Sequence, residues 1–182
     1  MQTKIHIKPV TYIYLVILLF ILPLKWLLAW VFAAAFHEAS HWIAVKVCGG
    51  EIYYITIGIG GAKMECGPMT KKKGILAVLC GPFGGLLLVF FARWIPRIAL
   101  CSWFLSCYNL LPLQSLDGGR ALEIMLGKRA FAIQKVFVML LAIGAFYASM
   151  CLRCGFLPVV VVSALWLKNR NNPCKPDCCK VQ

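Results

Sequence analysis

The chain has 182 residues, of which 62% are hydrophobic and 14% are charged, and its formal net charge is +13. A soluble domain of this size has too little interior to hide so much apolar surface, so the composition predicts a protein embedded in the lipid bilayer. The cations lie in short connections between apolar segments, a pattern typical of membrane topology signals that argues against nucleic-acid binding.

The apolar segments predict an all-α polytopic membrane protein with about six transmembrane helices. The expected spans are residues 10–24, 26–47, 74–92, 95–113, 130–150 and 155–167. We expect residues 1–167 to form one membrane domain. The polar segment 168–182, which contains Asn-Asn-Pro, is expected to be a disordered cytoplasmic tail.

Two short elements are expected outside the spans. Residues 51–67 combine β-prone residues with several glycines, which predicts a β-hairpin at the membrane surface, the alternative being a plain connecting loop. A hairpin has an open edge, so Tyr53, Tyr54 and Ile55 are candidates for pairing with an extended substrate segment. A short amphipathic helix is expected at residues 121–126.

The distribution of cations predicts the orientation. With the first segment placed in the cytoplasm, all but four of the 19 Lys and Arg residues fall on the cytoplasmic side. The four exceptions are Lys25, Arg93, Arg97 and Arg153. The positive-inside tendency therefore predicts a multi-pass protein of the cell membrane with both termini in the cytoplasm.

The second expected span contains His37-Glu38-Ala39-Ser40-His41, an HExxH pattern. On a helix, residues four apart share one face, so both imidazoles can reach one zinc ion, and Glu38 can act as a general base. Buried polar groups are costly in a membrane, and the chain has only three His, so a chance occurrence is a weak alternative. The other alternative is an interfacial His pair with a snorkelling Glu38.

A catalytic zinc site needs a third protein ligand. In the expected topology the second and fourth spans both end at the cytoplasmic side, and Asp117 follows the fourth at a depth similar to that of His41. Pro112 and the glycines after Asp117 would break the helix there, which membranes tolerate beside a water-filled cavity. Asp117 is therefore the preferred ligand and Glu123 the alternative, while a helix cap would be a purely structural role for Asp117.

The same residues predict a hydrolytic mechanism. Zinc would activate a water and polarise a peptide carbonyl, and Glu38 would move the proton from the water to the leaving amine. Asn109 is a polar residue in an apolar span and a candidate donor to the oxyanion, with an interhelical hydrogen bond as the alternative.

At this point the sequence resembles the site-2 protease family of intramembrane zinc metalloproteases, and within it the sporulation branch that releases membrane-associated pro-sigma-K. The matching motifs are His37-Glu38-x-x-His41 and Asn109-x-x-Pro112-x-x-x-x-Asp117-Gly118. The resemblance implies one Zn²⁺ per chain, a membrane-associated protein substrate and inhibitory membrane proteins as partners. The segment from Gly81 to Gly85 resembles the family's Gly-Pro-x-x-Asn turn, except that Gly85 replaces the Asn.

Two other functions remain open from the sequence. A membrane metal transporter would also place His and Asp within the bilayer, although it would be expected to carry more polar residues along its path. A catalytically silent scaffold that binds membrane proteins would not depend on Glu38.

Overall fold

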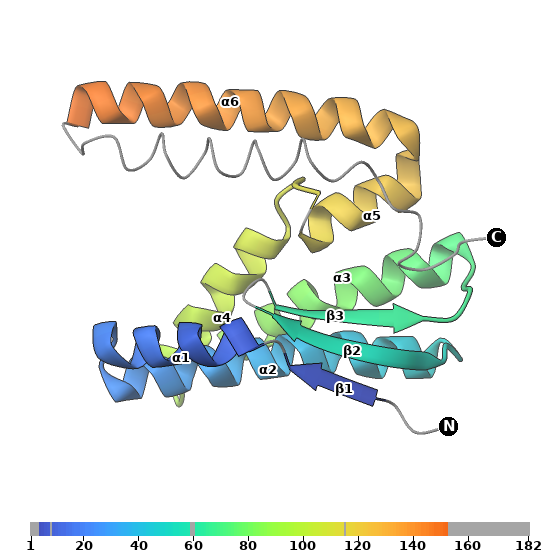
Figure 1. The fold of residues 1–182 in the computed structure, drawn as a ribbon, viewed down its shortest axis with the longest axis horizontal. Coiled ribbons are helices and arrows are strands. Elements are labelled where there is room, and N and C mark those ends of the chain that lie inside the picture. Colours follow the sequence, from blue (N-terminus) through green and yellow to red (C-terminus); the bar gives the residue numbers. More distant parts are fainter. Residues whose placement is uncertain (1–3, 8, 59–60, 115, 153–182) are drawn as a thin grey trace.

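The computed structural model describes residues 4–7, 9–58, 61–114 and 116–152, and is mostly helical with one small sheet (Figure 1). Its elements in chain order are β1 (Lys4–Ile7), α1 (Pro9–Ile21), α2 (Leu24–Val47), β2 (Ile52–Gly58), β3 (Gly61–Cys66), α3 (Lys71–Leu87), the 3₁₀ helix η1 (Leu88–Phe91), α4 (Pro96–Asn109), α5 (Asp117–Leu126) and α6 (Lys128–Leu152). The expected sixth span and the expected tail lie outside the described residues.

Helices occur at all five of the expected spans that the structure describes. Two of them, residues Lys71–Phe91 and Lys128–Tyr147, are long and apolar enough to cross a membrane. The six-span topology and the cytoplasmic termini remain predictions. Many large apolar side chains on α1 and α6 are exposed, among them Phe20 and Tyr147, as expected for helices that face lipid.

The centre of the fold is a group of three helices in which α2, α3 and α4 pack against one another. Helix α5 packs on α3 and also on α6, so it connects the long outer helix to this group (Figure 1). Buried residues Ala44, Val45, Ile52, Met69 and Ala77 form a core cluster that joins α2, the sheet and α3.

Local signals define both ends of α2. Pro23 immediately precedes the helix, where its missing N–H would have no partner in any case. At the other end, Gly49 adopts a positive φ of 76°, a conformation that glycine tolerates and that reverses the chain. Lys73 donates a 2.8 Å hydrogen bond to the Cys48 carbonyl, so it satisfies one of the free acceptors at the helix end.

The predicted hairpin is confirmed, because β2 and β3 pair antiparallel from Ile52↔Cys66 to Gly58↔Gly61. Strand β1 was not expected, and it pairs parallel with β2 in the register Lys4↔Tyr54 to Ile7↔Ile57. The strand order is β1-β2-β3, so β2 is the central strand. The prediction of an open edge at Tyr54 and Ile55 is therefore wrong, because a strand has two edges and both are occupied here.

The connection between α4 and α5 also differs from expectation. Helix α4 ends at Asn109, earlier than residue 113, because Pro112 cannot continue the helical hydrogen-bond pattern. Helix α5 begins at Asp117 rather than at residue 121, and an acidic side chain in the first turn interacts favourably with the helix dipole. Asp117 is therefore part of a helix, not of an irregular loop.

Helices α3 and α4 approach closely because glycine and serine face each other. A Cβ added at Gly85 would overlap Ser106 Oγ, and Ser102 Oγ donates a 2.8 Å hydrogen bond to the Gly85 carbonyl. Ser102 and Ser106 are both fully buried. Small residues of this kind let membrane helices pack at short range.

We expect Gly85→Ala to destabilise the protein by about 1–3 kcal/mol, because the added methyl group forces α3 and α4 apart. Thermal unfolding in detergent measures the change. Gly144→Ala is the control, since a Cβ there meets no atom within 4 Å among the described residues. The double variant Gly85→Ala, Ser106→Ala should recover stability, because it removes the overlapping hydroxyl. Failure of that rescue would contradict this account of the interface.

Candidate metal centre

Three donor atoms from distant parts of the chain meet at one point. His37 Nε2 lies 3.0 Å from Asp117 Oδ2, His41 Nε2 lies 3.1 Å from the same oxygen, and the two Nε2 atoms are 3.2 Å apart. The two His come from adjacent turns of α2 and Asp117 from the start of α5. The structure thus brings together the two His and the Asp that the sequence selected as ligands.

The triangle of donor atoms has the size of one face of a zinc tetrahedron. Zinc bonds of about 2.0–2.1 Å at tetrahedral angles place neighbouring donors roughly 3.3 Å apart. The observed separations of 3.0–3.2 Å are close to this value. Two imidazoles and one carboxylate also form a donor set typical of catalytic zinc, which leaves a fourth position for water or substrate.

The hydrogen bond of His41 to the backbone orients its ring in a way that suits a metal ligand. His41 Nδ1 is 2.9 Å from the Ala77 carbonyl oxygen, which can only accept, so Nδ1 carries the proton and donates it. In the neutral ring, Nε2 then presents a lone pair to the oxygen of Asp117. Two acceptors at 3.1 Å repel each other unless a proton or a metal ion lies between them. Either can occupy this point, and metal-bound imidazoles commonly donate their other N–H to a backbone carbonyl, as His41 does here.

The site is screened from solvent. Asp117 is 7% exposed and His37 is 3% exposed, and His41 is half-buried. The remaining nitrogen of His37, Nδ1, is buried without a hydrogen-bond partner among the described residues. Of the two imidazoles, therefore, only His41 is oriented by a protein carbonyl within the described part of the chain.

Helix α3 packs directly against the imidazole of His41. A Cβ added at Gly81 would overlap the imidazole of His41, and one added at Gly84 would overlap Ser40. The segment from Gly81 to Gly85 is helical, as the expected span 74–92 requires, and does not form the turn that it resembles in the site-2 protease family. Pro82 lies in the middle of α3 and cannot donate to the carbonyl one turn earlier. The glycines thus have a steric function, since they let α3 approach the ligands closely.

The other predicted site residues are placed as follows. Glu38 is half-buried on α2, next to His37, and near enough to His41 for its charge to act on that ring. Asn109 is the half-buried last residue of α4. Glu123, the alternative ligand, is absent from the three-residue group and accepts a hydrogen bond from Gln134 instead. Tyr54 and Ile55 are paired on both sides in the central strand, so neither has an open edge, and Tyr53 lies at a register shift beside them.

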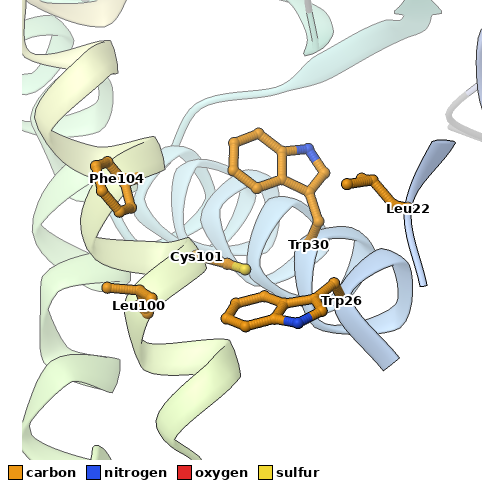
Figure 2. A pocket seen from close by; sticks show the side chains of 6 residues that line it. All are labelled: Leu22, Trp26, Trp30, Leu100, Cys101 and Phe104. Atoms are coloured by element: carbon orange, nitrogen blue, oxygen red, sulfur yellow. The ribbon is translucent and has the colours of Figure 1, made fainter. Parts of the chain in front are cut away.

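A separate apolar cavity of about 220 Å³ lies between the starts of α2 and α4 (Figure 2). It is lined by Leu22, Trp26, Trp30, Leu100, Cys101 and Phe104. Figure 2 shows the two indole rings projecting from α2 beside the α4 side chains. Its lining contains no carboxylate or imidazole.

Asp117→Asn should weaken zinc binding at least ~10-fold, because the amide lacks the negative charge that balances the metal. Zinc content after equilibration with a chelator measures this. Glu51→Gln, at an exposed carboxylate, is the control and should keep its zinc. Equal zinc retention by Asp117→Asn and the unaltered protein would remove Asp117 from the ligand set.

Gly81→Ala should also weaken zinc binding, by about 10–100-fold, because the new methyl group displaces the imidazole of His41. The same chelator competition measures it, with Gly144→Ala as the control. Unchanged zinc affinity in Gly81→Ala would contradict the steric function assigned to this glycine.

Comparisons with known proteins address the fold. No protein-family model and no curated protein sequence matches this chain. In contrast, its structure is similar to that of a solved site-2 protease from Methanocaldococcus jannaschii, with a TM-score of 0.67. The match covers 94% of this chain and 91% of the other, at 17% sequence identity. The apolar helices and this neighbour support a membrane protein, and the chain has the fold of a site-2 protease.

Proposed function

We propose that the chain is an intramembrane zinc metalloprotease that cuts a membrane-associated protein. The main support is the convergence of His37, His41 and Asp117 within 3.2 Å of one another, in a fold shared with a site-2 protease. Glu38 lies on the same helix as the two His, where a general base is needed. The proposal accounts for why polar groups stay buried among apolar helices.

Each residue has a distinct task in this reaction. His37, His41 and Asp117 would hold the ion, which when bound makes a water more acidic and polarises the carbonyl of the peptide. Glu38 accepts a proton as the water oxygen adds to the carbonyl carbon. It returns that proton to the amide nitrogen as the carbon–nitrogen bond breaks, so the products are a carboxylic acid and an amine.

Asn109 is proposed as the donor to the oxyanion. It ends α4, and the chain from there leads directly to Asp117 at the start of α5. A carboxamide N–H aimed at the developing negative charge stabilises the transition state more than the ground state. An interhelical hydrogen bond remains the competing role, and it would leave catalysis unaffected by Asn109→Ala.

The proposed substrate is a membrane-associated pro-sigma factor. The support is the resemblance of the two short motifs to those of stage IV sporulation protein FB, the pro-sigma-K processing protease. The segment to be cut must be extended, because helical hydrogen bonds shield a peptide amide from attack. Its pairing with Tyr54 and Ile55 would require β1 to leave β2, since Lys4 and Ile5 occupy those positions.

The proposed setting is the cell membrane, with about six spans, both termini in the cytoplasm and one zinc ion per chain. The positive-inside distribution supports this orientation. Inhibitory membrane proteins are proposed as partners through the same sequence similarity.

The decisive variant is Glu38→Gln. It should keep one zinc ion per chain and lose cleavage of a membrane-associated pro-sigma-K by at least ~10²-fold, because the amide cannot accept the proton. Zinc content and cleavage are measured in the same reconstituted preparation. Glu51→Gln is the control, as Glu51 is an exposed carboxylate at the start of the hairpin.

The outcomes separate three functions. Cleavage by Glu38→Gln at the normal rate would refute the proposed general base. Zinc transport into vesicles, with no cleavage by either protein, would favour a transporter. Substrate binding that is independent of Glu38, again without cleavage, would favour a scaffold.

A further inference from the structure

Helix α6 contains one polar side chain that is completely buried. Gln134 is 0% exposed and lies within the apolar stretch Lys128–Tyr147. Its neighbours one turn away on the same face, Ala130 and Val138, are buried and apolar. A carboxamide in such a place is costly unless it is hydrogen-bonded, so the contacts of Gln134 need an explanation.

Both described hydrogen bonds of the Gln134 side chain are made to α5. Its Nε2 donates to the Gly119 carbonyl oxygen at 3.1 Å and to Glu123 Oε1 at 3.2 Å. A carboxamide NH₂ has two hydrogens, so it can serve both acceptors at once. Gln134 therefore clamps the first and second turns of α5 from the α6 side.

The first turn of α5 also carries Asp117, and it packs closely against the connection between α4 and α5. A Cβ added at Gly118 would overlap the Leu110 carbonyl, and one added at Gly119 would overlap the Leu113 carbonyl. The turn is thus packed against the α4–α5 connection without spare room. Across α6, the turn is held by the two hydrogen bonds of Gln134. Val138 packs instead against Leu113 and Leu116, which precede α5.

Small displacements of this turn matter for the metal site. Asp117 is two residues before Gly119, and its Oδ2 lies 3.0–3.1 Å from both imidazoles. A shift of about 1 Å would take the carboxylate out of bonding geometry, because zinc–oxygen bonds vary by only a few tenths of an ångström.

We propose that Gln134 is a positioning residue for the metal centre: it fixes the first turn of α5 through the Gly119 carbonyl, so that Asp117 meets His37 and His41. The inference rests on the proposed metal site and adds a residue from another helix, α6, that contacts neither metal nor substrate. It also gives Glu123 a function other than ligation, as the second acceptor of the same carboxamide.

The test is Gln134→Met, which keeps the length of the side chain and removes its donor. Zinc affinity is measured by chelator competition on the full chain in detergent, and the visible absorption of Co²⁺ in the site reports ligand geometry. We expect zinc binding about 10–100-fold weaker and an altered Co²⁺ spectrum. The unfolding midpoint of the metal-free protein should change little, because the methionine fills the same space.

Val138→Ala is the matched control, since it loosens the same face of α6 one turn away without touching the hydrogen bonds. It should lower the stability of the metal-free protein but keep the zinc affinity and the Co²⁺ spectrum. Gln134→Asn is a second variant that keeps a carboxamide but shortens its reach. It should weaken zinc binding too, and it decides the question if Gln134→Met does not fold.

Normal zinc affinity and a normal Co²⁺ spectrum in the folded Gln134 variants would overturn the inference and leave the proposed function intact. An equal loss of zinc in Val138→Ala would also overturn it, because general packing would then explain the effect. Absence of zinc binding at His37, His41 and Asp117 in the unaltered chain would instead refute the proposed function, and the inference with it.

Discussion

The structure depends on one electrostatic constraint, the meeting of three electron-rich atoms in an apolar interior. The Nε2 atoms of His37 and His41 and the Oδ2 atom of Asp117 lie within 3.2 Å of one another. Unless a proton or a metal ion lies among them, these atoms repel one another, and their burial limits screening by water. The packing that surrounds the three atoms therefore has to hold them together until a positive charge binds.

Different helices supply that packing in different ways. Helix α3 approaches α2 through glycines at positions 81 and 84, which leaves room for an imidazole where a side chain would otherwise be. In α5, Gly118 and Gly119 pack directly against backbone carbonyls of the preceding connection, where a larger side chain would overlap them. Close contacts at glycines thus hold the three ligand residues in place. Most of the residues that position the ligands have no reactive side chain of their own.

The sequence predicted the parts of the site that follow from local geometry. Residues four apart on a helix share a face, so the pairing of His37 with His41 follows from their spacing alone. Asp117 followed from an argument about depth, but the choice against Glu123 needed the contact with Gln134. Gln134 itself had a signal, because it is a polar residue in a long apolar helix, yet its partner on another helix could not be read from the sequence.

The parts of the fold that were not predicted from the sequence depend on contacts between segments far apart in the chain. Strand β1 has only four residues, too few for a convincing alternation, and its partner lies some fifty residues away in β2. The segment around Pro82 lies within the expected span 74–92, although it resembles a turn of the site-2 protease family. It stays helical because α2 and α4 both pack against α3, so tertiary contacts outweigh the local preference.

The contact between His41 and Ala77 has a consequence for how such a site evolves. The acceptor is a main-chain oxygen, so replacing the side chain at position 77 leaves that oxygen in place. The orientation of the imidazole therefore depends on where the backbone of α3 lies. Side-chain substitutions along α3 would not remove this hydrogen bond, so a mutational scan would not detect it. Sequences can therefore diverge widely along this helix, provided its side chains stay small enough, while the geometry that matters is inherited with the backbone.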